Sequence, residues 1–519
     1  MRSGLSVFAA AAAALLSTSA LASPGHQTPL PSHHGWTVDP AHPPYTAPAN
    51  SASGTWSALT NAFPGSGFPD TSLLLTDGTV MMHDGCTTDW YRLTPDNTGS
   101  YVNGSWTKMA SMPSGYSPLY FASQVLPDGH VIINGGEYIN CSAVWTNKGA
   151  LYDTATNTWT TVTPPSGWTH IGDAQSVVRA DGNYMVANCC SQQEAIATIS
   201  GTSVTWTSTG TGKGDENDEE GWTQIPGGMI FTVDANRDLG SQNDVEIYSE
   251  SSGAWTTQST KTPVSCTDPG SHEIGPAPLL PNGLIYQLCG TAHTAVYDPV
   301  AATWTTGPDV PNVGGSLDIA DGPAAVLPDG NVLFQASPGV FQGGPSHFFE
   351  ATVTDANNVT ITQVSEPASA SGQNSYEGRL MVLPSGQVLW ASDVGDVEIY
   401  TPQGKPAKNA IPKIKKVKAS LTVGSSNNKI SGFGFNGLTF GGYYGDDVQQ
   451  STNYPIVRIT NVGSGHVCFG KTHNYATGIS DGSLTNAKFD IPATCETGAS
   501  NLQVVVNGIA SKVKAVTLN

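Results

Sequence analysis

An acidic residue or a tyrosine recurs at a fixed distance before a glycine-containing turn that occurs seven times in the chain. The turn glycines are Gly78, Gly129, Gly182, Gly228, Gly283, Gly330 and Gly386. About nine residues before them stand Asp70, Tyr120, Asp173, Glu219 or Glu220, His272 with Glu273, Asp321, and Tyr376 with Glu377. If these segments converge in the fold, the side chains share one opening. The candidate catalytic residues are therefore Tyr120, Glu220, His272, Asp321, Tyr376 and Glu377.

Carboxylates gathered in one place suit several kinds of chemistry. They raise one another's pKa, which favours general acid–base catalysis, and they bind hard cations such as Ca²⁺. Two of them about 5–10 Å apart can cleave a glycosidic bond. The alternative for any single acid is that it caps the turn beside it, but agreement in register across the repeats favours a shared site.

The elements that position these residues are repeated hairpins. Each copy, such as LYFASQVLPDGHV from Leu119, has a short apolar strand, a Pro/Asp-Gly turn and a second apolar strand. A tryptophan motif recurs about every 50 residues, at Trp56, Trp106, Trp159, Trp206, Trp255 and Trp304, with Ile361 as a degenerate seventh copy. Two hairpins per repeat make a four-stranded blade, and seven blades close a ring that leaves no sheet edge exposed.

The predicted fold is therefore all-β. We expect a seven-bladed kelch-type β-propeller over residues 54–402, followed by an immunoglobulin-like β-sandwich over residues 403–519. The second domain is inferred from alternating apolar segments such as YPIVRIT and NLQVVVNGI. A solenoid is the rival for the repeats, but it favours a smoother repeat with capping units.

Composition narrows the range of functions. Lys and Arg number 21 against 41 Asp and Glu, a formal charge of −20, which argues against nucleic acid or an anionic membrane surface as partner. Residues 1–22 resemble a signal peptide, and residues 23–53 a Pro/Ser/His-rich linker. The prediction is a secreted protein, extracellular or periplasmic, without a membrane span. A closed propeller has no free edge to extend, so we expect a monomer.

Eight cysteines, all after the predicted leader, favour disulfides in an exported protein. Cys266–Cys289 and Cys468–Cys495 are plausible local bridges, and Cys189 with Cys190 could form a vicinal one. The spacing does not decide the connectivity.

These features together resemble the galactose oxidase and glyoxal oxidase group of secreted copper-radical oxidases, which carry an early-set C-terminal domain. The most specific part runs from Tyr376 through LPSGQVLW to VEIYTP, which ends at Pro402. The resemblance implies metal ligands at Tyr120, Tyr376, the position of Glu377, and His473 in the sandwich. Glu377 replaces a histidine of the family pattern, and Pro69 replaces the cysteine that would cross-link to Tyr120. The ligand set is incomplete, because a carboxylate suits copper less well than an imidazole does.

Three functions remain open. The leading hypothesis is a carbohydrate-directed enzyme of lyase or hydrolase type that takes a carbohydrate or small polar substrate at the carboxylate ring. The second is a copper-radical oxidase with a modified site, and the third is a non-catalytic glycan- or surface-binding propeller. The cofactor stays open between copper and calcium.

Overall fold

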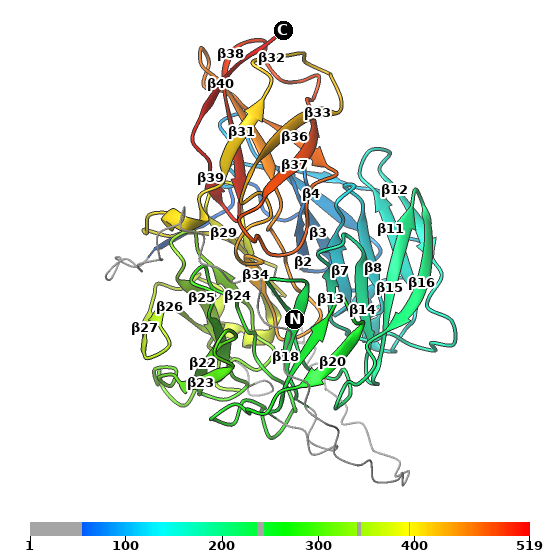
Figure 1. The fold of residues 1–519 in the computed structure, drawn as a ribbon, viewed down its shortest axis with the longest axis vertical. Helices are drawn as coiled ribbons and strands as arrows, with labels where there is room; N and C mark the ends of the chain where they lie inside the picture. Colours follow the sequence, from blue (N-terminus) through cyan, green and yellow to red (C-terminus); the bar gives the residue numbers. More distant parts are fainter. Residues whose placement is uncertain (1–53, 236–242, 340–343, 394) are drawn as a thin grey trace, which may run out of the picture. The chain divides into compact units, whose positions relative to one another are not determined.

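A computed structural model describes residues 54–235, 243–339, 344–393 and 395–519 of the chain, which all belong to one compact unit, Gly35–Asn519 (Figure 1). The predicted signal peptide and linker lie outside the described residues. The described part is built from β-strands and three 3₁₀ helices, η1 Ala370–Gly372, η2 Ser375–Glu377 and η3 Lys408–Ala410. None of its helices has the length and apolar character of a membrane span.

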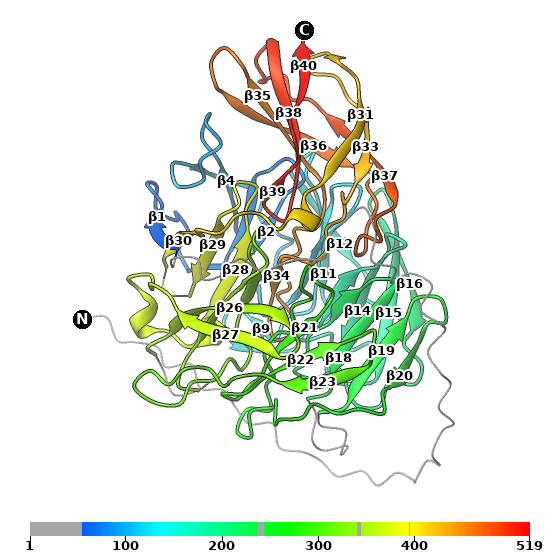
Figure 2. The same cartoon turned by 60° about the vertical axis from the view of Figure 1, so that its left-hand side comes forward.

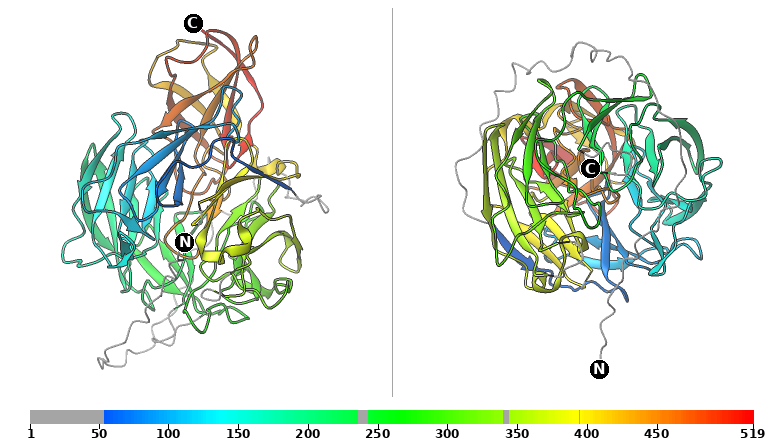
Figure 3. Two further views of the ribbon diagram at one scale, coloured as in Figure 1. Left: turned by 180° about the vertical axis from the view of Figure 1, so that it is seen from behind. Right: turned by 90° about the horizontal axis from the view of Figure 1, so that it is seen from below.

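Seven antiparallel sheets form the blades of the propeller and are arranged in a ring (Figures 1 and 3). The strands of each blade are given from the innermost outward. Blade 1 contains β2 (Pro69–Leu74), β3 (Val80–Asp84), β4 (Trp90–Thr94) and β5 (Ser105–Lys108), and blade 2 contains β7 (Ala122–Val125), β8 (Val131–Asn134), β11 (Gly149–Asp153) and β12 (Thr158–Val162). Blade 3 contains β13 (Ser176–Val178), β14 (Tyr184–Asn188), β15 (Gln193–Ser200) and β16 (Ser203–Thr209). A small extra sheet follows blade 1 and contains β6 (Pro118–Leu119), β9 (Tyr138–Ile139) and β10 (Ser142–Ala143).

The remaining blades continue the same order. Blade 4 contains β17 (Thr223–Ile225), β18 (Met229–Val233), β19 (Val245–Ser249) and β20 (Ala254–Thr257), and blade 5 contains β21 (Ile285–Leu288), β22 (Thr294–Asp298) and β23 (Thr303–Thr306). Blade 6 contains β24 (Ala324–Val326), β25 (Val332–Ala336), β26 (His347–Asp355) and β27 (Asn358–Gln363). Blade 7 contains β28 (Gly378–Val382), β29 (Val388–Ser392), β30 (Val397–Thr401) and β1 (Thr55–Ala58). In blade 5 an isolated bridge, Leu279 to Ile285, takes the place of the innermost strand. The predicted all-β propeller is confirmed.

In blades 1 to 3 the tryptophan repeat links the blade to the one before it. Trp106, on the outer strand of blade 1, donates from Nε1 to the Asn61 carbonyl at 3.0 Å, just beyond the outer strand of blade 7. Trp159 does the same to Ala110 at 2.9 Å, and Trp206 to Thr163 at 2.7 Å. A ring that is both large and able to donate one hydrogen bond suits this boundary, which explains why tryptophan recurs there.

The ring closes with strands from both ends of the repeat region. Strand β1 pairs antiparallel with β30, so that Trp56 lies opposite Tyr400. The Tyr400 hydroxyl also accepts a hydrogen bond from the Gly54 backbone at 2.8 Å. The seventh blade therefore cannot form without the segment that precedes the first.

The strands after residue 412 form the sandwich, whose colours run from yellow through orange to red in Figures 1 and 2. Its strands are β31 (Lys413–Val417), β33 (Asn428–Phe433), β37 (Leu484–Asp490), β36 (Val467–His473), β35 (Ile456–Asn461), β38 (Gly498–Val506), β40 (Lys514–Leu518) and β32 (Ser420–Leu421), in order of pairing, with β39 (Ile509–Ala510) on β38. Strand β36 pairs with β35 through its first half and with β37 through its second, which joins the two layers. The predicted sandwich is confirmed; its boundary at residue 402 stays a prediction.

The sandwich covers the face of the propeller where the glycine turns lie. Tyr475 donates from its hydroxyl to the Leu126 carbonyl at 3.1 Å, and Thr477 donates to Arg179 at 2.7 Å. The ring of Phe469 packs against Gly78, in the turn of blade 1. Since the turns face the sandwich, the starts of the innermost strands lie at the opposite face.

One segment of the sandwich domain, residues 441–450, runs inward along the innermost strands; we call it the axial segment. Its strand β34 (Gly442–Tyr443) pairs with β24 of blade 6. Gln450 donates to the Ser72 carbonyl of blade 1 at 2.7 Å, and the Tyr444 hydroxyl donates to the Tyr376 carbonyl of blade 7 at 2.5 Å. All ten of its residues are buried. The axial segment thus joins the sandwich to the starts of the innermost strands.

A substitution at Gly445 shows whether the axial segment must approach blade 6 as closely as it does. A Cβ there would lie 2.2 Å from Asp321 Oδ1 and 2.7 Å from Asp321 Cα, so Gly445→Ala forces the segment away. We expect a loss of about 1–3 kcal/mol in the free energy of unfolding, measured by urea denaturation. Gly315→Ala, where a Cβ meets nothing within 4 Å, is the control and should be nearly neutral. Equal losses in both variants would contradict this account.

Candidate functional site

The innermost strands begin with residues in an unusual backbone conformation. Tyr120, Glu219, His272 and Asp321 have φ angles of 50°, 59°, 73° and 50°, in the left-handed region, and Gly172 has 72° at the same point of blade 3. A residue with a Cβ adopts this conformation at a cost of roughly 1 kcal/mol or more, and such residues concentrate at functional sites. The repeat therefore turns the chain sharply just where the predicted site residues stand.

These residues, together with the axial segment, form two adjoining groups. The group that we call the tyrosine half comes from blades 1, 2 and 7 and from the axial segment; it contains Asp70, Tyr120, Tyr138, Tyr376, Glu377, Arg379, Asp393 and Tyr444. The group that we call the acid half comes from blades 2 to 6 and from the axial segment; it contains Glu137, Asp173, Asp218, Glu219, Glu273, Asp321, Asp446 and Asp447. Half-buried side chains such as Tyr376, Glu377 and Glu219 form the rim, while Asp70, Arg379, Asp446 and Asp447 are buried beneath them.

Arg379 organises the tyrosine half. Its Nη2 donates to Asp70 Oδ1 at 3.2 Å, and Nη1 donates to the Tyr376 carbonyl at 2.6 Å and to the Tyr444 hydroxyl at 3.2 Å. Its guanidinium carbon lies 5.5 Å from the ring centre of Tyr120 and 4.6 Å from that of Tyr444. Burial opposes ionisation of Asp70, but the hydrogen bond with His83 and the charge of Arg379 outweigh it and lower the pKa of Asp70.

Three tyrosine rings gather above this ion pair. The ring centres of Tyr120 and Tyr376 are 6.4 Å apart, and those of Tyr120 and Tyr138 are 5.9 Å apart, both in edge contact. Burial and nearby carboxylates raise the pKa of Tyr120 and Tyr376 and raise that of Tyr138 to about 12. All three remain neutral phenols near pH 7, able to donate hydrogen bonds or to lie against a sugar ring.

Asp393 is a carboxyl group of the tyrosine half that, unlike Asp70, makes no hydrogen bond to Arg379. It follows β29, and its backbone N–H donates to the Glu377 carbonyl at 3.3 Å, so it lies at the open face. Its Oδ1 is buried without a hydrogen-bond partner among the described residues. Burial, with the charges of Asp70 and Glu377, raises its pKa well above the ordinary value despite the opposing charge of Arg379. Glu377 is held in place by the Asn374 N–H, which donates to Oε2 at 2.8 Å.

The acid half brings together carboxylates from separate segments. One oxygen each from Asp173, Glu219 and Asp446 lie within 4.8 Å of one another. Burial is the main cause that raises the pKa of all three, and neighbouring carboxylates raise them further. The pKa of Asp321 and that of Asp447 are each raised to about 7, and that of Glu137 to about 9. This half of the opening cannot carry its full negative charge at neutral pH without added protons or a cation.

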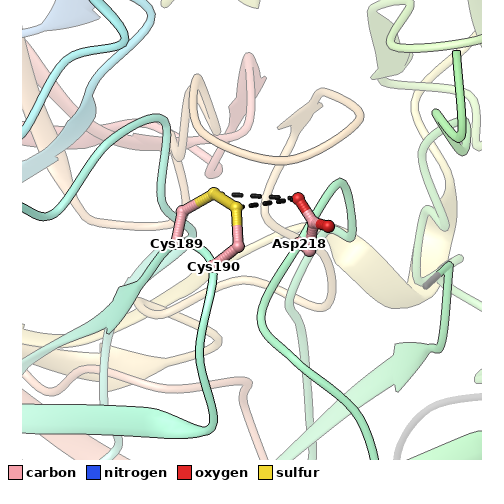
Figure 4. A group of neighbouring side chains, drawn as sticks. All are labelled: Cys189, Cys190 and Asp218. Atoms are coloured by element: carbon pink, nitrogen blue, oxygen red, sulfur yellow. Dashed lines mark hydrogen bonds between the residues drawn. A yellow bond between two sulfur atoms is a disulfide. The ribbon is translucent and has the colours of Figure 1, made fainter. Parts of the chain in front are cut away.

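The vicinal disulfide Cys189–Cys190 adjoins the acid half (Figure 4). Asp218 Oδ1 lies 2.8 Å from Cys190 Sγ and 3.8 Å from Cys189 Sγ. A disulfide sulfur carries no hydrogen, so the proton of either contact must come from the carboxyl group. The other bridges are Cys86–Cys141, Cys266–Cys289 and Cys468–Cys495. The three pairings expected from the sequence are therefore confirmed.

A separate buried cluster surrounds Lys213. Its Nζ lies 3.1 Å from Glu220 Oε1, 2.7 Å from Glu246 Oε2 and 3.6 Å from Asp234 Oδ1, and it also contacts Asp215. All five side chains are fully buried. Lys213 balances one negative charge, and burial raises the pKa of Glu220 well above its ordinary value and that of Asp234 to about 9, so these two groups keep protons near pH 7. The cluster therefore fits a structural role.

The structure brings together four of the six predicted catalytic residues: Tyr120, Asp321, Tyr376 and Glu377. His272 is half-buried at the start of the innermost segment of blade 5, next to Glu273 of the acid half. Glu220 instead points to Lys213, and it is Glu219 that faces the acid half. Counting back from the glycine could not distinguish two successive residues, because neighbouring side chains in extended chain point to opposite sides.

His473 is not the residue that reaches inward. It lies on β36, where its side chain contacts Asn474 Oδ1 at 2.9 Å and Asp490 Oδ1 at 3.3 Å. The axial segment, with Tyr444, Asp446 and Asp447, takes that place. The sequence reasoning also missed Arg379, Asp393 and Glu137. Asp393 and Glu137 could have been found from the hairpin pattern, because each follows the second strand of a hairpin. In an antiparallel pair, the second strand ends at the face where the first strand begins.

The donor set does not fit the copper site that the family resemblance implies. Near Tyr120 and Tyr376 the structure places carboxylates, phenols and the Arg379 guanidinium. The imidazole of His83 lies behind Asp70, and both of its nitrogens are engaged, at 3.2 Å from Asp70 Oδ2 and 3.0 Å from the Thr87 carbonyl. All eight cysteines of the chain are paired in disulfides, so no thiol is left to cross-link to Tyr120. Oxygen donors of this kind suit hard cations better than copper, and a buried guanidinium repels a metal ion beside it.

Comparisons with known proteins agree on the fold. No protein-family model matches the chain. Kelch-like protein terF of Aspergillus terreus is 25% identical over 263 residues, which cover 46% of this chain and 54% of that protein, so the chain matches about half the length of this curated relative. A solved structure of a fungal alcohol oxidase of the AA5 family, in complex with copper, aligns with a TM-score of 0.51 and 11% identity. The alignment covers 90% of this chain and 100% of the other.

These likenesses support a kelch-type propeller with a galactose-oxidase-like architecture. At 11% identity the structural likeness concerns the fold alone, and it leaves the site chemistry to be argued from the residues described above.

The Lys213 cluster allows a test of how its charges are balanced. Lys213→Met leaves buried carboxylates without their counter-ion and should cost about 3–5 kcal/mol of unfolding free energy near neutral pH. The pKa is already raised to about 8 for Glu194 and about 9 for Asp234, chiefly by burial. A carboxyl group with a raised pKa in the folded state takes up a proton on folding, so stability falls as pH rises above about 4.

Without the lysine these pKa values rise further. The groups of wild type begin to lose their protons above about pH 8, whereas those of the variant keep them, so the loss should be larger at about pH 9 than at about pH 7. Urea denaturation at both pH values measures it. Lys108→Met, which removes a largely exposed partner of Asp89, is the control and should change stability little at either pH. A loss in Lys213→Met that does not grow with pH would contradict the account.

Proposed function

We propose that this protein is an exported enzyme that hydrolyses a neutral polar glycan at the open face of the propeller. The observation that carries the proposal is Asp393, a half-buried residue at the open face whose Oδ1 atom is buried without a partner and which makes no hydrogen bond to the nearby arginine. Four disulfides support export to an oxidising compartment.

The charges of the opening favour a neutral or cationic substrate. Eight carboxyl groups belong to the acid half, and the buried cation beside them, Arg379, is already bound to Asp70. A polyuronate would be repelled there. A polysaccharide lyase removes a proton from the substrate carbon that bears a carboxylate group, and a neutral sugar has no such carbon. Hydrolysis is therefore favoured over the lyase reaction.

The tyrosine half offers what a sugar ring requires. Tyr120, Tyr138 and Tyr376 present aromatic surface and phenol groups, and aromatic faces commonly pack against the apolar faces of sugars. Arg379 and Asp70 fix the Tyr376 backbone and the Tyr444 hydroxyl from below. These residues position the substrate and take no proton.

Asp393 and Glu377 divide the proton transfers. The Asp393 carboxyl gives its proton to the glycosidic oxygen as the bond from that oxygen to the anomeric carbon breaks. Glu377 takes a proton from a water molecule whose oxygen forms the new bond to that carbon. Asp393 then returns to its acid form by taking a proton from solvent, and Glu377 releases one.

Conservative substitutions of these two residues test the proposal. Glu377→Gln and Asp393→Asn keep size and polarity but cannot exchange a proton, so cleavage should fall by about 10²–10⁴-fold while glycan binding is retained. The measurement is release of reducing ends from a panel of neutral polysaccharides by the purified full-length mature chain. In wild type, activity should decline as pH rises through the pKa of Asp393.

Glu496→Gln, at an exposed residue of the sandwich, is the control and should leave cleavage unchanged. A wild-type protein that binds a glycan from the panel but releases no reducing ends would show a binding protein instead of an enzyme. Full activity in both Glu377→Gln and Asp393→Asn would also overturn the proposal.

A further inference from the structure

The acid half contains three carboxylates arranged as ligands of one ion. Asp173 precedes β13, Glu219 precedes β17, and Asp446 comes from the axial segment, so three separate segments each supply one oxygen. The three oxygens lie within 4.8 Å of one another. Two oxygens bound to the same Ca²⁺ at about 2.4 Å are separated by at most about 4.8 Å, so this spacing allows all three oxygens to bind one ion.

Unpartnered acceptors beside the trio point to the same ligand. Asp447 is 1% exposed and Gln449 is 2% exposed. Both carboxylate oxygens of Asp447 and the Oε1 atom of Gln449 have no hydrogen-bond donor among the described residues, and neither has Asp173 Oδ1. The Nε2 end of the Gln449 amide lies beside Gly221, two residues after Glu219, and the charge of Asp447 acts on Asp173. Buried acceptors without donors are costly unless a cation or water satisfies them.

The charge balance supports a cation. Arg379 acts on Asp321 and Asp447, but no positive charge among the described residues ranks with the main influences on Asp173, Glu219 or Asp446. Lys213, by contrast, lies at the centre of its own four acids. The oxygens of Asp173, Glu219 and Asp446 lie as close together as those of Asp215, Glu220 and Asp234 around Lys213, but no lysine of the described residues lies among them.

The donor atoms decide the class of ion. Carboxylate and amide oxygens are hard donors and suit Ca²⁺, which accepts six to eight oxygens in irregular geometry, better than Mg²⁺, which demands a near-ideal octahedron. The nearest sulfurs belong to a disulfide, and the ligand atoms that lie within 4.8 Å of one another include no histidine nitrogen. We propose that Asp173, Glu219 and Asp446 bind one divalent cation of the calcium class.

This cation ties the axial segment to blades 3 and 4. The contacts described above join the segment to blades 1, 6 and 7, and the Leu279 N–H of blade 5 donates to the Tyr443 hydroxyl at 3.2 Å. An ion shared by Asp446, Asp173 and Glu219 would link it to the remaining side of the opening. The proposal does not depend on the hydrolysis proposed above, since the ligands are not the residues that transfer protons there.

Calcium binding to the full-length mature protein tests the proposal. Bound ions are removed with a chelator, and Ca²⁺ is then titrated by calorimetry into wild type, Asp446→Asn, Glu219→Gln and the control Asp481→Asn, an exposed acid of the sandwich. Wild type and control should bind one Ca²⁺ per chain. Affinity should fall at least about tenfold in the two site variants. Ca²⁺ should also raise the melting temperature of wild type and raise that of the site variants much less.

The ion-free proteins provide the check on folding. Removing one of several crowded negative charges should leave ion-free Asp446→Asn at least as stable as ion-free wild type, so loss of binding cannot then be attributed to unfolding. Wild type that binds no Ca²⁺, site variants that bind it as wild type does, or a preference for Cu²⁺ over Ca²⁺ would each overturn the proposal.

The two proposals fail separately. Glu377→Gln should bind Ca²⁺ like wild type while losing cleavage. Calcium binding without any glycan cleavage would overturn only the hydrolase proposal. Cleavage without calcium binding would overturn only the proposed cation site.

Discussion

The pairing of β34 with β24 is the interaction on which the site depends. It joins the axial segment to the innermost strand of blade 6 through backbone hydrogen bonds, with Tyr443 opposite Ala324 and Gly442 opposite Ala325. A backbone buried along the axis has to satisfy its polar groups, and a strand edge satisfies them in a regular way. The next residues, Tyr444, Asp446 and Asp447, are thereby held against the strand starts of the other blades. Without this pairing the opening would lack part of both halves.

The order of the blades follows from features that sequence periodicity reveals well. The tryptophans recur because each outer strand must contact the blade before it, and the glycines recur because each hairpin needs a left-handed residue; Gly78, Gly129 and Gly330 have φ of 77°, 90° and 94°. Counting back from these glycines places Tyr120, Asp321 and Tyr376 at the start of the innermost strands. Local rules of turn and strand geometry are sufficient for that much of the site.

The remainder of the site depends on contacts that local rules do not contain. The family pattern suggested His473, but β36 places it on the sandwich beside Asp490, and nothing in the order of residues shows that the segment from Gly441 enters the axis instead. Arg379 looks like an ordinary strand residue until the fold brings it to Asp70, 309 positions away. Whether Glu219 or Glu220 faces the opening is decided by a left-handed turn at Glu219, which periodicity does not predict.

Buried carboxylates need a balancing charge, and the Lys213 cluster and the acid half differ in where that charge comes from. Around Lys213 the chain supplies its own cation, which removes the need for a ligand and leaves Glu220 without a free role in chemistry. In the tyrosine half Asp70 is treated in the same way by Arg379, and this frees Asp393 to keep its proton. The acid half has no such partner among the described residues for Asp173, Glu219 and Asp446. A fold that neutralises two buried acidic groups with its own side chains and leaves the third group open to solvent at its rim is arranged to receive a charge from outside.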